Sequence, residues 1–397
     1  MPSPTVASGS PTVALSHLAW PFFDDAHRSL ATAARAWAAQ QSVDPADTYA
    51  ACHKWVRALG VAGFLRYTVP RAWGGALDAL DSRALCVLRE VLAAHDGLAD
   101  FAFAMQGLGS GAITLGGSDA MKQAWLPRVA DGTAIAAFAL SEPDAGSDAG
   151  ALTTRAERVA GGWRLDGEKT WISNGGIADF YCVFARSEPG SAGSKGITGF
   201  LVPATTPGLE ITARLPVISP HPLATLRFSG CVIGDAQVLG EPGAGFQLAM
   251  RTLDIFRVSV AAAAVGFARR ALDETLRRAR TRAMFGTTLG AQPLAQAIIG
   301  DMATDLDAAA LMTYRAAWQR DTQQGRTTAV AAMAKLASTE LAQQIIDRAV
   351  QLHGGRGVLV GEVVERLYRD IRALRIYEGA TEVQRLLVGR ETLKAAR

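Results

Sequence analysis

The sequence of 397 residues lacks the motifs that mark several large classes of enzyme. Each Gly-x-Gly, starting at Gly107, Gly109, Gly243 and Gly355, lacks the third glycine of the G-x-G-x-x-G dinucleotide fingerprint. No Gly-Lys pair indicates a phosphate-binding loop, and no G-x-S-x-G indicates a hydrolase nucleophile. These absences argue against a doubly wound nicotinamide enzyme, a P-loop phosphotransferase and a serine hydrolase.

Cysteine and histidine are scarce and scattered. The four cysteines, Cys52, Cys86, Cys182 and Cys231, form no C-x-x-C and no pairing pattern, which predicts buried thiols in a reducing compartment. The six histidines stand apart without an H-E-x-x-H motif, so we expect no metal site.

An excess of one charge is also lacking. There are 40 Lys and Arg residues against 37 Asp and Glu, and no basic block, which argues against nucleic-acid binding. The longest uncharged stretch after the N-terminus, residues 101–118, holds five glycines and four polar residues, so we expect no membrane span. The N-terminus has neither the basic region nor the apolar run of a secretory signal. We therefore expect a soluble, cytoplasmic protein.

Apolar residues make up 49% of the chain, which is too long for one small core, so two or three domains are expected. Residues 1–14, rich in Pro, Ser and Thr, predict a flexible tail. Helical spacing of apolar residues predicts an N-terminal α-helical domain over 15–133 and long helices over 246–397. Short runs broken by Gly and Pro predict an antiparallel β-barrel or sandwich domain over 134–245, including a hairpin at Gly161–Gly162.

Four segments combine small residues with groups able to bind a ligand: Ala137–Asp148, Lys169–Gly176, Arg280–Leu289 and Gln351–Glu362. The first is a turn rich in hydroxyls, and the second places Trp171 where it could stack on a flat ring. The third offers Arg282 to a phosphate, and the fourth has glycines that allow close approach. Taken singly, each has a commoner structural explanation: a surface turn, a core Trp, or the end of a helix.

One carboxylate has an unusual setting. Glu378, in "LRIYEGATEVQ", follows the apolar Leu374, Ile376 and Tyr377 and precedes the small residues Gly379 and Ala380. It either ends a helix at the surface or is a base that faces a bound molecule.

Two long, ordered stretches resemble the acyl-CoA dehydrogenase family of flavoproteins: "SDAMKQAWLPRVADGTAIAAFALSEPDAGSD" and "QLHGGRGVLVGEVVERLYRDIRALRIYEGATEVQ". The resemblance extends from about residue 15 to the end. It implies an α+β multidomain fold in which the C-terminal helices form a four-helix bundle. FAD would lie between the middle domain and the bundle, in a homotetramer or homodimer whose neighbouring subunit completes the site.

The resemblance also implies roles for individual residues. Glu378 would be the catalytic base, since Phe256 occupies the position at which other members carry theirs. The residues expected to bind FAD are Phe138, Leu140, Ser141, Gly146, Ser147, Trp171, Ser173, Arg282, Phe285, Gln292, Gln351, Gly354, Gly355, Ala380 and Glu382. The residues expected to contact the substrate are Ser147, Asp254, Arg257 and Gly379.

The implied reaction is α,β-dehydrogenation of an acyl-CoA to a trans-2-enoyl-CoA. Glu378 would remove the α-proton, with its pKa raised by burial, while its own N–H polarises the thioester carbonyl. The β-hydride would pass to flavin N5 and the electrons to an electron-transferring flavoprotein. A side chain at Gly379 would obstruct the thioester.

The sequence departs from the family pattern in its expected FAD contacts. Ala380 replaces a common Thr, Pro293 follows Gln292 where a Gln is usual, and Met284 replaces a frequent Gln. Ser141 and Ser173 stand where Thr is common and keep the hydroxyl.

Other functions are consistent with the same pattern. An acyl-ACP dehydrogenase would share the fold and differ in the carrier of the acyl group, although Asp254 and Arg257 favour CoA. Relatives that use oxygen, and desulfinase-type relatives, alter or lack the glutamate that Glu378 matches. A non-catalytic oligomeric scaffold would differ by lacking FAD.

Overall fold

The computed structural model describes residues 15–323 and 326–395, so the predicted tail, residues 1–14, lies outside the described part. The chain forms two compact units. The helical unit consists of Met1–Gln41, Ser82–Asp100 and Arg257–Arg397, and the sheet unit consists of Ser42–Asp81 and Phe101–Phe256. Both units are therefore assembled from separate stretches of chain. The predicted domain boundaries at 133/134 and 245/246 remain predictions.

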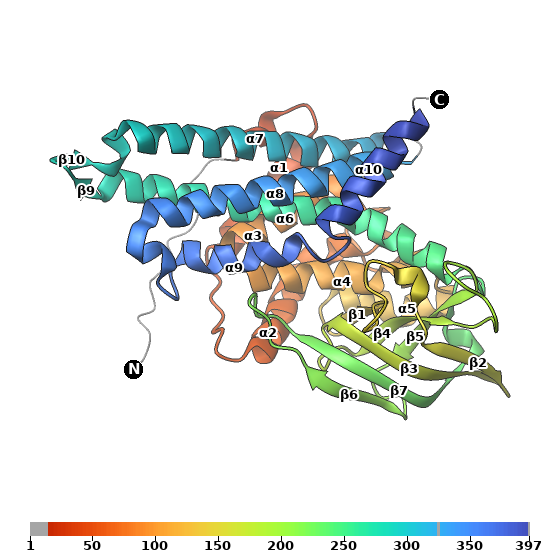
Figure 1. The fold of residues 1–397 in the computed structure, drawn as a ribbon. Coiled ribbons are helices and arrows are strands. Elements are labelled where there is room, and N and C mark those ends of the chain that lie inside the picture. The colour runs from red at the N-terminus through yellow and green to blue at the C-terminus, as the bar shows by residue number, and fades with distance from the viewer. Residues whose placement is uncertain (1–14, 324–325, 396–397) are drawn as a thin grey trace. The chain divides into compact units, whose positions relative to one another are not determined.

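The helical unit is built around the long helix α6 (Gly245–Thr281), which belongs to it from residue 257 onward. Its other helices are α1 (Asp25–Ala38), α3 (Ser82–His95), α7 (Pro293–Thr322), α8 (Thr328–His353), α9 (Val363–Leu374) and α10 (Thr381–Ala395). Within this unit α7 and α8 run side by side (Figure 1). The alanines at 261–264 are fully buried, and their small side chains let neighbouring helices pack closely against α6. The predicted long helices are confirmed.

A buried polar network in the core of the helical unit is centred on Glu90 of α3. Its carboxylate accepts a hydrogen bond from Arg269 Nε at 2.6 Å and another from the Tyr314 hydroxyl. His17 Nε2 lies 3.1 Å from the same carboxylate. The network ties the short helix η1 (Ser16–Ala19), α3, α6 and α7 together at one buried group.

The sheet unit contains α2 (Thr48–Val61), α5 (Asp119–Ala130), most of α4 (Gly97–Gly116) and a sheet of eight strands. The strands are β1 (Ala136–Ala139), β2 (Arg155–Val159), β3 (Gly162–Ser173), β4 (Phe180–Arg186), β5 (Ile197–Pro203), β6 (Leu209–Arg214), β7 (Leu223–Gly234) and β8 (Val238–Leu239). They are ordered β6-β7-β3-β2-β4-β5-β8, with β1 beside β4.

The predicted hairpin is confirmed, since β2 and β3 pair with Val159 opposite Gly162. The sheet is nevertheless mixed, because β1 pairs with β4 in parallel, Ala136 opposite Phe180. The prediction of an antiparallel β domain is therefore wrong for the pairing of β1 with β4. The connection from β1 to β4, residues 140–179, includes the β2–β3 hairpin and is long enough for the crossover that parallel pairing requires.

Among residues 15–323 and 326–395, no helix combines the length and apolarity required to cross a bilayer. In the same residues, no group of three or more His, Cys, Asp or Glu side chains is arranged to hold a metal ion. Each of the four thiols is buried, as predicted.

Candidate active site

Glu378 lies in the tight connection between α9 and α10, in a backbone conformation that is rare for a side chain other than glycine. Its φ is 51°, and Gly379 follows with φ 94°. The Gly379 carbonyl accepts hydrogen bonds from Lys335 Nζ at 2.8 Å and from Gln384 Nε2 at 3.0 Å. The Thr381 N–H closes the turn on the Arg375 carbonyl at 3.1 Å. The turn is thus held from two helices, α8 and α10.

Gly379 is required by its immediate surroundings. A Cβ atom at this position would lie 2.2 Å from Gln384 Nε2, and the positive φ would strain any other residue. Clearance for a thioester therefore remains a prediction, whereas the positive φ already accounts for the glycine.

Burial and nearby positive charges act in opposite directions on the Glu378 carboxyl group. Its side chain is half-buried, and the buried Oε2 has no hydrogen-bond partner among the residues that the structure describes. Burial raises the pKa of Glu378, and the positive charges of Arg89, Arg257 and Lys335 oppose part of that rise. A carboxylate with a raised pKa is a stronger base toward a weakly acidic carbon than an exposed one.

Arg89 supplies a fixed positive charge near this carboxyl group. Its Nε and Nη2 donate to the two oxygens of Asp100, each at 2.8 Å, and Nη1 donates to Ser259 Oγ at 3.0 Å. Burial alone would lower the pKa of Arg89, but the Asp100 carboxylate raises it above its ordinary value. The side chain is therefore oriented by α4 and α6 rather than free to follow a ligand.

Lys335 is, after Arg89, the second cation near Glu378 that the sequence analysis does not predict. It is fully buried on α8, and burial lowers its pKa to about 8. Neither Arg89 nor Lys335 belongs to a motif. Their signal was a charge within an otherwise apolar helical pattern, with Arg89 beside Glu90 in "CVLREVLAA" and Lys335 alone in "AAMAKLAS", which indicates a buried charge without naming its partner.

In the sheet unit, the turn after β1 presents the first group of predicted FAD contacts. Phe138 is half-buried and packs on Phe184, with ring centroids 5.0 Å apart. The Leu140 carbonyl accepts from Lys169 Nζ at 2.9 Å, and the Ser141 carbonyl accepts from the Thr170 N–H at 3.0 Å. Gly146 and Ser147 are exposed. The turn is therefore fastened to β3 through its backbone, which leaves the Ser141 and Ser147 hydroxyls at the surface of the unit.

Glu142 anchors this turn from inside. It accepts from Lys169 Nζ at 2.8 Å, from the Thr153 and Thr154 N–H groups at 2.6 and 2.9 Å, and from Thr153 Oγ1 at 2.9 Å. Burial would raise the pKa of Glu142, but the Lys169 charge and these donors lower it to about 2. The buried pair fixes the turn relative to β3.

Trp171 is exposed, so the explanation of this residue as part of the core is wrong. Its side chain is 58% exposed and its φ is 59°. The pairing of β3 with β7 shifts register between Lys169 and Ile172, and this bulge turns Trp171 out of the sheet. Ser173, two residues on, is half-buried. An exposed aromatic ring in a strained conformation beside a hydroxyl-rich turn suits a flat ring that stacks on it.

Three family models match successive segments: the N-terminal domain of acyl-CoA dehydrogenase over residues 24–133, its middle domain over 137–231 and its C-terminal domain over 243–393. The human mitochondrial short-chain specific acyl-CoA dehydrogenase is 40% identical over 347 residues, which are 86% of this chain and 83% of the relative. The chain belongs to the acyl-CoA dehydrogenase family.

Solved structures of acyl-CoA dehydrogenases are similar to this chain over most of its length. Butyryl-CoA dehydrogenase from Megasphaera elsdenii is 30% identical, with a TM-score of 0.87 over 94% of this chain and 99% of that one. A glutaryl-CoA dehydrogenase from Mycobacterium smegmatis in complex with FADH2 is 26% identical, with a TM-score of 0.85 over 94% and 95%. This member of the family is a flavin-dependent oxidoreductase with FAD as cofactor, and the exposed Trp171 and the turn after β1 are compatible with a flavin ring.

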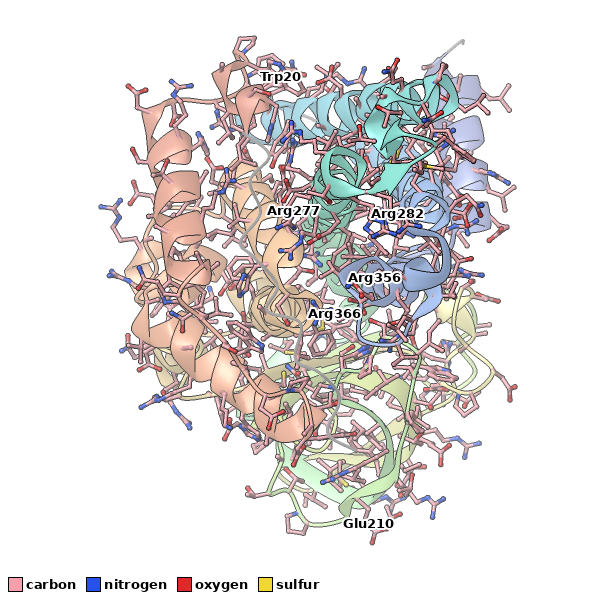
Figure 2. The ribbon with its side chains drawn as sticks, turned by 90° about the vertical axis from the view of Figure 1, so that its left-hand side faces the viewer. Trp20, Glu210, Arg277, Arg282, Arg356 and Arg366 are labelled. Carbon is pink, nitrogen blue, oxygen red and sulfur yellow. The ribbon has the colours of Figure 1, made fainter. Side chains whose placement is uncertain are left out.

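A third group of predicted FAD contacts lies far from Glu378 within the helical unit. Arg282 and Phe285 are at the short hairpin of β9 (Ala283–Met284) and β10 (Thr287–Thr288), next to the α8–α9 turn that holds Gly354 and Gly355 (Figure 1). Burial and the charges of Arg282 and Arg356, both labelled in Figure 2, lower the pKa of Arg278. These residues form a positively charged end of the helical unit.

The distance of this end from the base follows from helix geometry. Lys335, which binds the Glu378 turn, and Gln351 are 16 residues apart on α8, or about 24 Å at 1.5 Å per residue. One flavin ring cannot contact both. Phe285 is 87% exposed with φ 48°, and Gln351, Gly354 and Gly355 are exposed. A contact with another subunit's FAD therefore remains the prediction for this group.

The remaining predicted residues are divided between the units. Asp254 belongs to the sheet unit, and Arg257 is buried in the helical unit, where its charge acts on Glu378. Glu382 is exposed on α10 and Ala380 is half-buried beside the turn. Gln292 precedes α7, whose first residue is Pro293; a proline is well suited to this position because the N–H that it lacks has no helical acceptor there.

Proposed function

We propose that the protein oxidises a short acyl-CoA thioester to the trans-2-enoyl-CoA, with Glu378 as the base that removes the α-proton. The observation that carries the proposal is the Glu378 carboxyl group, with one buried oxygen that has no hydrogen-bond partner and with a pKa raised by burial. A base of this kind accepts a carbon-bound proton, because the neutral form that results is the form that burial favours.

The backbone N–H of Glu378 supplies a hydrogen-bond donor beside the base. The described residues provide no acceptor for the Glu378 N–H, whose direction is set by the left-handed turn. This N–H donates to the thioester carbonyl and stabilises the negative charge that develops as the proton leaves. Base and hydrogen-bond donor then belong to one rigidly held residue.

The sheet unit binds the cofactor. Phe138, Leu140, Ser141, Ser147, Trp171 and Ser173 would hold the flavin ring, and the Glu142–Lys169 pair keeps their backbone in place. FAD, when bound, accepts the β-hydrogen as hydride. Asp254 and Arg257 would contact the CoA part of the substrate.

Assembly and electron transfer complete the proposal. The positively charged end with Arg282, Phe285 and the Gly354–Gly355 turn would contact the FAD of a neighbouring subunit in a homotetramer or homodimer. An electron-transferring flavoprotein would reoxidise the enzyme. The names of the human and Megasphaera elsdenii relatives favour short straight-chain thioesters as the first substrates to test.

The test is anaerobic reduction of the purified yellow enzyme by a panel of acyl-CoA thioesters. Bleaching of the flavin absorbance, strongest with one short chain length, is the expected result, and the enoyl-CoA should form in equal amount. A flavoprotein that no acyl-CoA bleaches would contradict the proposal. If only acyl-ACP bleached the flavin, the carrier of the acyl group would be ACP instead of CoA.

A further inference from the structure

Lys335 is a fully buried cation whose position the chemistry described so far does not use. Within residues 15–323 and 326–395, no carboxylate lies close enough to its Nζ to form an ion pair, and its hydrogen bond is to the Gly379 carbonyl. Burying an ammonium without a paired carboxylate is costly, because the charge loses its hydration and gains no ion pair in return. A lysine retained under such a cost needs a function that a neutral residue cannot supply.

The hydrogen bond of Lys335 holds the backbone of the base. Nζ donates to the Gly379 carbonyl at 2.8 Å, and Gln384 Nε2 donates to the same oxygen at 3.0 Å and to the Glu378 carbonyl at 3.4 Å. The consecutive carbonyls of Glu378 and Gly379 are therefore restrained in a turn whose φ angles are both positive. The restraint fixes the directions of the Glu378 side chain and N–H.

The charge of Lys335 also acts on the Glu378 carboxylate, together with the charges of Arg89 on α3, Arg257 on α6 and Asp100 on α4. Lys335 in turn lies in the field of Glu340 on α8 and Glu382 on α10. Tyr377, whose pKa burial raises, precedes the base in the chain. Arg89 is balanced by Asp100 at 2.8 Å, and Glu340 by Arg375 at 2.8 Å. The ammonium of Lys335 has no carboxylate at ion-pair distance in the described chain, so its charge adds to those of Arg89 and Arg257, which act more strongly on Glu378.

We propose that Lys335 is a positioning residue for the active-site base: its hydrogen bond to Gly379 sets the left-handed turn at Glu378, and its ammonium keeps the Glu378 carboxylate ionised until the substrate proton is transferred. This inference rests on the proposed role of Glu378 and names a residue that acts through it.

The test uses the FAD-loaded enzyme with Lys335→Met, which keeps the side-chain volume and removes both donor and charge. Loss of a nearby cation raises the pKa of a carboxyl group, so the acid limb of the pH profile of kcat should move up by about one pH unit. Turnover at pH 7 should fall about tenfold or more, with KM changed much less. Lys335→Arg, which retains the charge, should return the acid limb toward that of the wild type.

A second readout does not depend on turnover. The protonated Glu378 carboxyl group should give an infrared difference band that titrates with pH and is absent from Glu378→Gln. In Lys335→Met the midpoint of this band should move up with the acid limb. Lys394→Met, at an exposed lysine of α10, is the matched control and should change neither.

Distinct results separate the two hypotheses. If Glu378→Gln retains turnover, the proposed function itself is wrong. If Glu378→Gln is inactive while Lys335→Met keeps the wild-type acid limb and infrared midpoint, Lys335 is only structural and the inference is overturned. If Lys335→Met does not fold, Lys335→Gln takes its place, because it keeps a hydrogen-bond donor without the charge. The inference then requires that its acid limb of kcat and its infrared midpoint both move up, and unchanged values would overturn it.

Discussion

At the scale of single residues, the active site is defined by two consecutive left-handed positions. Glu378 and Gly379 have φ values of 51° and 94°, and only the second is a glycine. A left-handed conformation at a residue other than glycine costs about 1–3 kcal/mol and persists where the surroundings impose it. Here Lys335 and Gln384 hold this conformation by donating hydrogen bonds to the Gly379 carbonyl.

Gly379→Ala tests whether this turn is as constrained as the contacts indicate. The new Cβ would lie 2.2 Å from Gln384 Nε2 at a positive φ, so the free energy of unfolding should fall by about 1–3 kcal/mol. Chemical denaturation measures the loss. The control is Gly389→Ala in α10, where an added Cβ meets no atom within 4 Å and a gain of up to about 1 kcal/mol is expected. Equal effects at both glycines would mean that the turn tolerates a side chain.

Residue-level prediction from sequence succeeded where chemistry is local. The apolar run before Glu378 and the small residues after it indicated a carboxylate near the interior, and Oε2 is indeed buried. Arg89, Asp100 and Lys335 were missed. They approach the base from three helices, and the sequence gives the face of a helix on which a charge lies but not which distant segment it meets.

At the scale of elements, strand β3 positions the residues of the sheet unit that are proposed to bind FAD. Lys169, from its interior, reaches the Leu140 carbonyl and Glu142, and the bulge immediately after it exposes Trp171. Local pattern predicted the β2–β3 hairpin correctly. The bulge and the parallel partnership of β1 with β4 were not predicted, because both depend on strands that are remote in sequence.

Lys169→Met should destabilise the turn after β1, since it leaves the buried Glu142 carboxylate without its cation. Breaking a buried pair in this way costs about 3–5 kcal/mol. Thermal or chemical unfolding measures the effect, and FAD should bind more weakly. Lys195→Met, at an exposed lysine of the same unit, should stay within about 0.5 kcal/mol of the wild type. A similarly small change at Lys169 would show that Glu142 is held by its threonine donors alone.

The same pair has a defined pH dependence. The pKa of Glu142 in the folded protein, about 2, lies below its ordinary value of 4.5. Its contribution to stability is therefore complete above pH 4.5 and is lost as the pH falls toward 2, where the folded-state carboxylate takes up a proton. The stability difference between wild type and Lys169→Met should accordingly shrink in this acidic range.

At the scale of the whole molecule, the sequence predicted the order of helices, strands and helices. It did not predict that residues 82–100 and α1 would join the C-terminal helices in one compact unit. The Glu90 network shows why: the partners of this α3 carboxylate, His17, Arg269 and Tyr314, come from three distant stretches of chain. Such a union is set by packing between segments, and no pattern within any one of them encodes it.

The measurement that tests the central claim most directly is the rate of flavin reduction in Glu378→Gln, after anaerobic mixing with the thioester that bleaches the wild-type enzyme best. Glutamine keeps the size of the side chain and cannot accept the α-proton. Reduction should be slower by about 10²- to 10⁴-fold, with FAD content and melting temperature unchanged. Glu391→Gln, at a half-buried glutamate near the end of α10 that pairs with Lys394, should reduce its flavin at the wild-type rate. A Glu378→Gln enzyme within a few fold of the wild type would show that another group is the base.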